Sequence, residues 1–347
     1  MLPKVLAAFN LHSSAAIVPF GSGLINHTWK VTNDGHDYIL QRINNQVFRE
    51  PWNISDNIRM IGTYLSEHHS DYLFTLPEKT ITGEDLYHAE QEGYFRLFPF
   101  IKGSHTIDVV QNAQQAYTAA FEFGRFTSLL SGFPANRLKI TIPDFHNLSL
   151  RYSKFLLALT EGIPQRIANA KDAIQFILFQ DNIVRLYSDI IKNDQFKIRV
   201  THNDTKISNV LFDESGGGLC VIDLDTVMPG YFISDVGDMM RTYLCPVSEE
   251  ETDFKKIEIR EGFYEAIVTG YSEQMNNTLT KAEKQHFLYA GQFMIFMQAI
   301  RFLTDYLCGD VYYGSKYPEH NLARAKNQIV LFQKLSEHKH LIKLSSA

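Results

Sequence analysis

Strand-like and helical patterns occupy different parts of this chain. Residues 16–20, 28–32 and 37–43 are short runs rich in β-branched and aromatic side chains, and glycine or asparagine turns separate them. Such runs predict three consecutive antiparallel strands. From Val109 onward, the apolar residues instead recur at helical spacing. The chain therefore has to combine a sheet near its start with a larger helical region, which is an α+β fold.

The remainder of the first hundred residues extends this sheet. Pro51 begins a helical stretch that runs to about residue 67. The apolar face of this stretch consists of Ile54, Ile58, Ile61 and Leu65. Residues 84–89 and 94–101 predict two more strands. We therefore expect a five-stranded sheet with one helix in this part of the chain.

The C-terminal region carries apolar stripes that predict helices with one buried face. One stripe consists of Ala116, Ala120, Phe123, Gly124, Thr127 and Leu130, and another of Ile174, Ile177, Leu178 and Val184. A chain of 347 residues is longer than one hydrophobic core usually serves. We therefore expect two lobes that divide near residue 101.

Composition excludes several classes of function. The net charge of −6 argues against a non-specific nucleic-acid binder, because phosphate backbones demand a basic surface. Three cysteines, at positions 220, 245 and 308, lack the spacing of a zinc site or a disulfide framework. No apolar run is long enough to span a membrane, and the first residues do not resemble a signal peptide. We expect a cytoplasmic protein that binds neither membrane nor nucleic acid, and no protein partner is implied.

The most specific motif is a set of oxygen-bearing side chains in residues 202–225. Asp204 and Asn209 stand five positions apart, and Asp223 and Asp225 follow after a glycine-rich turn. Phosphoryl transfer requires a carboxylate that faces the acceptor hydroxyl and hard oxygen ligands for Mg²⁺. Asp204 is predicted to orient and deprotonate the hydroxyl, while Asn209 and Asp223 are predicted to bind the metal. Taken singly, each of these residues could equally be a turn, a cap or a solvated strand end.

The same segment predicts a hairpin. Residues 209–212 and 219–224 read as two short strands, and residues 213–218 form the turn between them. This hairpin is expected to carry Asn209 and Asp223 on paired strands. Because side chains two positions apart share a strand face, Asp225 is expected to lie beside Asp223 and to bind metal or substrate.

The nucleotide phosphates have weaker signals. Gly21 and Gly23 lie between two predicted strands, where a Cβ would obstruct the approach of backbone N–H groups to phosphate. The third strand lacks the lysine that protein kinases place there. Arg42 is the candidate replacement, and Gln41 should point to the other face of the sheet. The glutamate expected on the following helix as the partner of that lysine is also missing, and either Asp56 or Asn57 could substitute for it.

These residues resemble the aminoglycoside phosphotransferase and choline kinase superfamily, and within it most closely the N-acetylhexosamine 1-kinases. The strings that carry the resemblance are residues 202–209, 222–230, 21–28, 38–44, 98–100 and 301–306. The resemblance implies a bilobal protein-kinase-like fold. A small β-rich nucleotide-binding lobe would comprise residues 1–101, and a mainly helical catalytic and substrate-binding lobe residues 102–347.

The resemblance also implies ATP, Mg²⁺ and a set of acceptor-binding residues. His27, Arg301 and Tyr312 would bind the sugar, together with Asp204 itself. Each has a plainer interpretation: His27 could shape the glycine loop, Arg301 could pair with Asp305, and Tyr312 could be core. His146 is a further candidate without an assigned role.

Three supporting residues follow from the same resemblance. His202 would be structural, and Asp235 and Asp238 would support the catalytic loop or simply cap a helix. Arg241 could pair with either carboxylate.

The predicted function is phosphorylation of the anomeric hydroxyl of an N-acetylhexosamine by ATP. Choline, an aminoglycoside or homoserine are alternative acceptors within the same class. Choline would call for an aromatic cage, and an aminoglycoside for a cluster of acidic residues. A nucleotide-binding regulatory protein without turnover is the alternative from another class.

Overall fold

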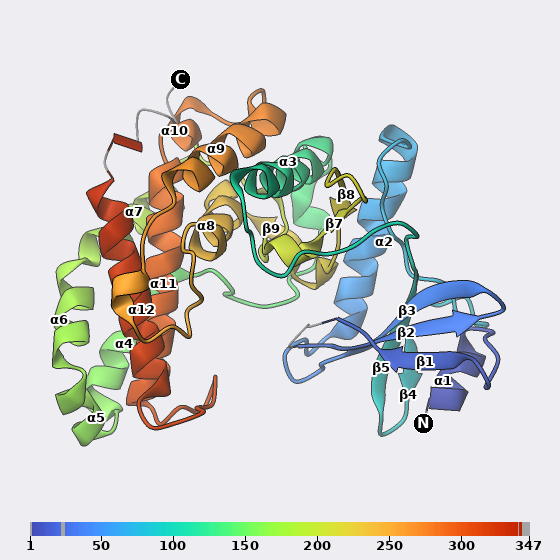
Figure 1. Cartoon of the computed structure of the whole chain (residues 1–347), viewed down its shortest axis with the longest axis horizontal. Helices are drawn as coiled ribbons and strands as arrows, with labels where there is room; N and C mark the ends of the chain where they lie inside the picture. Colours follow the sequence, from blue (N-terminus) through green and yellow to red (C-terminus); the bar gives the residue numbers. More distant parts are fainter. Residues whose placement is uncertain (1, 22–24, 339, 342–347) are drawn as a thin grey trace. The chain divides into compact units, whose positions relative to one another are not determined.

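The computed structural model of the chain describes residues 2–21, 25–338 and 340–341. The described chain divides into two compact units. The first unit combines Met1–Asp108 with Leu129–Pro143 and Ser208–Pro229, and the second contains the remaining residues. The α+β fold is confirmed, with an antiparallel sheet near the N-terminus and a larger helical region after it (Figure 1). The predicted division of nucleotide and substrate roles at residue 101 stays a prediction.

Within the described residues, the first unit contains a five-stranded antiparallel sheet of order β1-β2-β3-β5-β4. The strands are β1 (Ala16–Pro19), β2 (His27–Asn33), β3 (His36–Ile43), β4 (Tyr87–Ala89) and β5 (Gly93–Pro99). One face of the sheet packs against a short helix, α1 (Leu2–Ala8), that the sequence patterns did not predict. The core of this face is formed by Val5, Leu6, Phe9, Val31, Leu40, Phe95 and Leu97.

The helix predicted after Pro51 is α2 (Pro51–His68), which is visible beside the sheet in Figure 1. Proline at its first position suits a helix start, because that N–H has no partner in the helix. All four residues of its predicted apolar face are buried: Ile54, Ile58, Ile61 and Leu65. Apolar burial at this spacing accounts for the helix without any cap from Glu50.

The hairpin in the first unit consists of β7 (Val210–Phe212) and β8 (Gly218–Val221). The prediction that Asn209 and Asp223 lie on its paired strands is wrong. Asn209 ends the short 3₁₀ turn η2 (Ile207–Asn209), and Asp223 lies beyond β8. The strand alternation predicted for Asp223 and Asp225 is also wrong, because Asp223 adopts a left-handed conformation with φ 58° and the turn η3 (Leu224–Thr226) follows. The backbones still meet, since the N–H of Ile222 donates to the carbonyl of Asn209 at 2.9 Å.

The second unit is mainly helical. Its longer helices are α3 (Ala113–Leu129), α4 (Leu148–Glu161), α8 (Phe232–Tyr243), α9 (Glu261–Met275), α11 (Phe287–Leu307) and α12 (His320–Glu337). Its shorter helices are α5 (Pro164–Asn169), α6 (Lys171–Phe179), α7 (Asp181–Ile190) and α10 (Lys281–Lys284). The remaining short elements of the chain are η1 (Ala135–Arg137), β6 (Arg199–Thr201), β9 (Met228–Gly230) and η4 (Phe254–Lys256).

Helix α11 forms the centre of the second unit. It packs against α4, α8 and α12, and nearly all of its residues are buried (Figure 1). A helix that is apolar all round belongs in a core. Of the helices described, none combines the length and apolar character that a membrane span requires.

The structure bears out the first of the two predicted apolar stripes but not the second. The first lies along α3 and ends just beyond it, and its residues are buried. The second belongs to two helices, α6 and α7, rather than to one. Ile174 and Ile177 are buried, but Leu178 is 40% exposed, because the stripe was drawn across the break between these helices.

Candidate active site

Helix α8 holds the loop that contains Asp204. The carboxylate of Asp235 accepts hydrogen bonds from the backbone N–H groups of His202 at 3.0 Å and Asn203 at 2.7 Å. The carboxylate of Asp238 accepts from the N–H of Thr205 at 2.9 Å. These aspartates therefore support the catalytic-type loop and do not cap α8, which begins at Phe232. The predicted supporting role is confirmed, and the capping alternative is wrong.

Burial of this loop support has an electrostatic cost. Burial raises the pKa of Asp235 to about 7, although the two backbone N–H groups favour its charged form. Burial also raises the pKa of Asp238, and Arg241 opposes that shift. Arg241 pairs with Asp238 at 3.0 Å and with Glu249 at 3.1 Å. The Asp238–Arg241 pair is thus one of the two pairings that the sequence left open.

His202 is a structural residue, as predicted. Its side chain is fully buried, and the rings of Phe123 and Phe126 meet it edge to face at centroid distances of 5.1 Å and 6.4 Å. The loop is therefore anchored by a buried ring at one end and by α8 carboxylates along its backbone. This support leaves Asp204 at a fixed place at the end of β6.

Asp204 has a neighbour that the sequence analysis missed. The ammonium of Lys206 lies 3.0 Å from a carboxylate oxygen of Asp204, with side-chain exposures of 48% and 20% respectively. The negative charge of Asp204 is the main cause of a raised pKa for Lys206. Lys206 stands two positions after Asp204 in the sequence, and this spacing could have identified it as a neighbour of the carboxylate.

Charged side chains of the second unit, Asp204 among them, act on the imidazole of His146. His146 carries a buried Nδ1 atom, although the residue as a whole keeps some exposure. Burial, together with the positive charges of Arg301, Arg241 and Arg151, lowers the pKa of His146 to about 3, and the charge of Asp204 opposes the shift. The imidazole is therefore neutral at neutral pH. We call His146, Arg151, Asp204, Lys206 and Arg301 the acceptor cluster.

Arg301 and Tyr312 lie close together. The structure contradicts the two plainer interpretations, a pair between Arg301 and Asp305 and a core position for Tyr312. Arg301 does not pair with Asp305; it donates to the side-chain oxygen of Gln298 at 3.2 Å. Asp305 instead accepts from the N–H groups of Tyr312 and Tyr313 at 2.7 Å and 2.9 Å. Tyr312 is 72% exposed, so it is not a core residue. The Arg301 guanidinium lies 5.8 Å and 5.5 Å from the centres of the two tyrosine rings.

In the first unit, the backbone contact described above joins Asn209 to Ile222, the residue that precedes Asp223. Asn209 is buried, whereas Asp223 is exposed. An amide oxygen and a carboxylate are hard donors, and Mg²⁺ usually takes one or two carboxylates and fills its other positions with water and phosphate oxygens. This donor set fits Mg²⁺. Among the described residues, no group of three or more His, Cys, Asp or Glu side chains is arranged to hold a metal.

Asp225 has contacts that the sequence did not predict. One carboxylate oxygen lies 2.6 Å from the Nη1 atom of Arg96, and the other accepts from the side-chain amide of Asn26 at 2.8 Å. The contact with Arg96 is a buried ion pair. The signal in the sequence was an arginine between two apolar residues of a predicted strand, Phe95 and Leu97. The assignment of Asp225 as a metal ligand stays a prediction.

The predicted nucleotide residues lie in and around β2 and β3. Arg42 is paired with Phe95 of β5 and lies on the sheet face that carries Leu40 and packs against α1. Gln41 lies on the other face, where it accepts from the Nε atom of Arg96 at 2.9 Å. Strand alternation therefore separates these two side chains, as the sequence predicted.

The residues at the start of β2 are described in part. Gly21 has φ +79°, a conformation that favours glycine, and a Cβ there would meet no other atom. Gly23 lies outside the described residues. His27 begins β2, is exposed, and stacks on Trp29 with ring centres 6.1 Å apart. The roles of Gly21, Gly23, Arg42 and His27 stay predictions.

Among the described residues, no cation forms an ion pair with either candidate for the acidic partner on α2. Asp56 is exposed. Asn57 is fully buried, and its amide group donates to the carbonyls of Lys139 at 2.9 Å and Val227 at 3.0 Å. Its oxygen accepts from the N–H of Lys139 at 2.7 Å. Asn57 therefore fixes two backbone segments and does not act as a charged partner.

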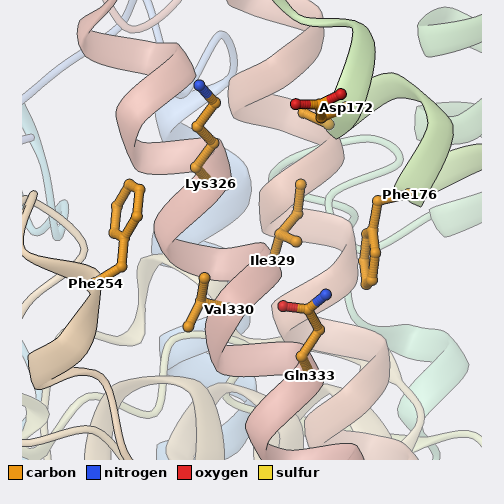
Figure 2. Close-up of a pocket in the computed structure, with 8 residues that line it drawn as sticks. Asp172, Phe176, Phe254, Lys326, Ile329, Val330 and Gln333 are labelled. Carbon is orange, nitrogen blue, oxygen red and sulfur yellow. The ribbon is translucent and has the colours of Figure 1, made fainter.

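The second unit also has a surface hollow that is lined by other residues. Figure 2 shows the hollow between α6, α12 and the turn η4. Phe176, Phe254, Ile329 and Val330 line it, with Asp172 and Lys326 at its edge. No residue of the catalytic motif or of the acceptor cluster lines this hollow.

A comparison with known families identifies the chain. Residues 16–275 match the model of the family described as "Phosphotransferase enzyme family". The chain belongs to this family. It is therefore a small-molecule phosphotransferase of the aminoglycoside phosphotransferase and choline kinase type. The resemblance found in the sequence is confirmed at this level, and the match does not extend to the sugar.

Solved structures of phosphotransferases share the fold. A microcompartment-associated aminopropanol kinase matches with a TM-score of 0.64 and 15% identity, over 99% of this chain and 98% of that one. An aminoglycoside phosphotransferase from Alicyclobacillus acidocaldarius matches with a TM-score of 0.61 and 11% identity, over 95% of each chain. A choline kinase from Cryptosporidium parvum matches with a TM-score of 0.57 and 10% identity, over 96% and 93%. At these identities the matches show the kinase-like fold alone.

Proposed function

We propose that this phosphotransferase transfers the γ-phosphoryl group of ATP to the anomeric hydroxyl of an N-acetylhexosamine, which forms the sugar 1-phosphate. The sequence strings shared with N-acetylhexosamine 1-kinases suggested this acceptor. The composition of the acceptor cluster is the structural observation that supports it over the amine acceptors named for several relatives.

The charges of the acceptor cluster favour a neutral acceptor. Arg151 and Arg301 both act electrostatically on His146, and among the described residues neither forms an ion pair with a carboxylate. The carboxylate of Asp204 already has Lys206 beside it. A cationic acceptor placed against Asp204 would meet these positive charges, whereas a sugar offers oxygen atoms that guanidinium groups can donate to.

The aromatic rings of this region give the same preference. A quaternary ammonium ligand is usually held by the faces of several aromatic rings. Here the rings of Tyr312 and Tyr313 already face the guanidinium of Arg301. A second cation would have to compete with Arg301 for these rings. An acetamido methyl group or an apolar sugar face makes no such demand and can pack against the exposed ring of Tyr312.

The proposed chemistry assigns one task to each residue. Asp204 orients the anomeric hydroxyl and accepts its proton as the hydroxyl oxygen attacks the γ-phosphorus, and ADP leaves. Arg301 and the neutral His146 hydrogen-bond sugar oxygens, and His27 is assigned a further sugar contact. Lys206 lies beside Asp204 and can hold its carboxylate in place.

The nucleotide and metal tasks belong to the first unit. Asn209 and Asp223 would hold Mg²⁺, with Asp225 as the further predicted ligand. Gly21, Gly23 and Arg42 are assigned to the phosphates of ATP. When bound, Mg²⁺ neutralises phosphate charge, and the chain contributes fixed oxygen donors for it.

The test compares neutral and cationic acceptors. Release of ADP is measured with N-acetylglucosamine, N-acetylgalactosamine, glucosamine, choline and an aminoglycoside. N-acetylglucosamine and glucosamine share a ring and differ in the charge at the 2-position. We expect kcat/KM to be at least about 10-fold higher for the neutral sugar, since unpaired guanidinium groups disfavour a nearby cation. The 1-O-methyl glycoside of N-acetylglucosamine, which lacks the reacting hydroxyl, is the control and should not be phosphorylated.

The results separate the alternatives. Higher kcat/KM for glucosamine, choline or the aminoglycoside would contradict the neutral-acceptor proposal and keep the kinase assignment. ADP release with the methyl glycoside would contradict transfer to the anomeric oxygen. Nucleotide binding without phosphorylation of any acceptor would favour a regulatory protein.

A further inference from the structure

The first unit contains a buried ion pair whose arginine, Arg96, has no task in the chemistry proposed above. Arg96 lies on β5 and Asp225 lies in the turn η3, and both side chains are 2% exposed. A buried charge is expensive unless it is paired and hydrogen-bonded. This pair joins two segments that are distant in the sequence, so it can fix the position of one relative to the other.

The pair belongs to a connected set of side chains. Gln41 on β3 accepts from the Nε atom of Arg96 at 2.9 Å. Asn26 donates to the second oxygen of Asp225 at 2.8 Å, and its own oxygen accepts from the N–H of Asn44 at 3.0 Å. We call Asn26, Gln41, Arg96 and Asp225 the turn cluster. It connects two central strands, the segment just after the glycine loop, and the turn that follows Asp223.

The residue before the turn held by this cluster has an unfavourable backbone conformation. Asp223 has φ 58° and ψ 59°, which an aspartate adopts only at some cost. Such conformations persist when the surrounding contacts determine them. Asp225 fixes the turn from one side through Arg96, and Asn57 fixes its end by donating to the carbonyl of Val227 at 3.0 Å. The direction in which Asp223 points therefore depends on contacts made by its neighbours.

We propose that Arg96 is a positioning residue that holds the turn after Asp223 in the conformation needed for binding Mg²⁺ with ATP, and that Asn26 couples this turn to the backbone at Asn44. The inference rests on the proposed function, because it assumes that Asp223 serves a metal–nucleotide site. Arg96 acts through Asp225 and does not contact the nucleotide.

Two observations support a positioning role over direct phosphate binding. Arg96 is almost fully buried, and its guanidinium is already occupied by Asp225 and Gln41. A phosphate would have to displace a carboxylate that is held at 2.6 Å and that Asn26 also binds. Arg42, the cation predicted to bind phosphate, lies on the opposite face of β3 from Gln41, so it cannot substitute for Arg96 in this cluster.

The experiment measures ATP binding with and without Mg²⁺ by calorimetry on the full chain. Arg96→Gln should reduce the gain in ATP affinity that Mg²⁺ provides by about 10-fold or more, with metal-free ATP affinity within about twofold of wild type. Arg96→Lys should lie between the two, since it keeps the charge and loses the planar fork. Asn26→Ala leaves the ion pair in place and should reduce the Mg²⁺ gain by about threefold.

Arg59→Gln is the matched control. Arg59 is also an arginine of the first unit that pairs with an aspartate, Asp85, but it is half-exposed and lies on α2. This variant should bind ATP with the wild-type dependence on Mg²⁺. Circular dichroism establishes that each variant is folded, and if Arg96→Gln is not folded, Asn26→Ala decides the question.

Each outcome bears on the inference separately from the proposed function. An unchanged Mg²⁺ gain in folded Arg96→Gln and Asn26→Ala would overturn the inference, as would an equal loss of metal-free and Mg²⁺-dependent affinity. If wild type binds ATP with Mg²⁺ and phosphorylates no acceptor, the proposed function fails while the effect of Arg96→Gln remains measurable. If Mg²⁺ gives wild type no gain in ATP affinity, the inference is overturned, because Arg96 then has no such site to support.

Discussion

The arginines of the two polar clusters of this protein differ in their partners. In the turn cluster of the first unit, Arg96 and Asp225 pair with each other in a buried environment. In the acceptor cluster of the second unit, Arg151 and Arg301 make hydrogen bonds to neutral groups, and the described residues provide them with no carboxylate partner. A charge whose partner is already present in the fold serves to hold a conformation. A charge left without an opposite one can interact with a ligand.

This difference gives a rule for interpreting each cluster. Removal of a charge from the turn cluster should affect stability and metal binding first, because its partner would be left buried and uncompensated. Removal of a charge from the acceptor cluster should affect the acceptor first, because the folded chain loses few contacts. The variants below test the rule in order of decreasing expected effect.

Asp204→Asn should cause the largest loss. The amide keeps the shape of the side chain but cannot accept the proton, so kcat should fall by about 10²- to 10⁴-fold. The affinity for ATP with Mg²⁺ should stay near the wild-type value. Steady-state kinetics and calorimetry on the same preparation check both parts. A rate within a few-fold of wild type would contradict the assignment of Asp204 as the base.

Arg96→Gln should cause the largest loss of stability. It leaves the Asp225 carboxylate buried without its cation, and the free energy of unfolding should fall by about 3–5 kcal/mol. Arg96→Met/Asp225→Leu removes both charges and should recover much of this loss. Urea denaturation measures both variants. If the double variant is no more stable than Arg96→Gln, the loss does not come from an uncompensated charge.

The double variant also sharpens the comparison between the clusters. It should regain stability without regaining the Mg²⁺-dependent affinity for ATP, since it lacks Asp225, which fixes the turn after Asp223 and is itself a predicted metal ligand. Recovery of both properties together would mean that the turn cluster contributes only stability.

Arg301→Gln should have an intermediate effect that is confined to the acceptor. Loss of a charged hydrogen bond to a sugar oxygen is worth about 1.5–3 kcal/mol, so KM for the N-acetylhexosamine should rise about 10- to 100-fold. The KM for ATP and the unfolding midpoint should change little. Initial rates at varied acceptor and varied ATP separate the two constants. An equal increase in both KM values would place the effect of Arg301 outside the acceptor site.

His146→Gln should have the smallest effect at neutral pH, and its effect should become visible in the stability as the pH falls. The pKa of His146 is lowered from 6.5 to about 3 in the folded chain, so the unfolded chain binds this proton more readily. Wild type should therefore lose stability through His146 as the pH falls from 6.5 towards 3, and His146→Gln should lose less over the same range. Above pH 7 the two curves should run parallel.

The comparison between these two proteins removes an opposing contribution. Asp235, with its pKa raised to about 7, lowers stability as the pH rises from about 4 to 7, because the folded chain holds its proton longer. Both proteins contain Asp235, so its effect cancels in the difference. Identical slopes below pH 6.5 would contradict a buried, neutral His146.

The sequence predicted the elements whose signals are local. The strands β1 to β3 and the apolar face of α2 follow from alternation and helical spacing in single segments. The motif from His202 to Asp223 was recognisable because its residue types and spacing express one kind of chemistry. The loop support by Asp235 and Asp238 was predicted from the family resemblance alone.

The parts that sequence patterns did not predict depend on distant contacts. Asp223 and Asp225 read as alternate positions of a strand, but the left-handed residue and the turn η3 break that pattern. The turn is stabilised by Arg96 and Asn57, which come from β5 and α2. No local propensity reports a partner that lies more than a hundred positions away. The same limit applies to Arg151 and His146, whose importance comes from the charges around them.

The most direct test of the central claim is a phosphorus NMR spectrum of the product formed from ATP, Mg²⁺ and N-acetylglucosamine by the wild-type protein. The account predicts a new phosphomonoester signal that is split by the single anomeric proton, with glucosamine and choline giving far less product under the same conditions. A product phosphorylated at another hydroxyl, or product formed only from an amine acceptor, would contradict the account.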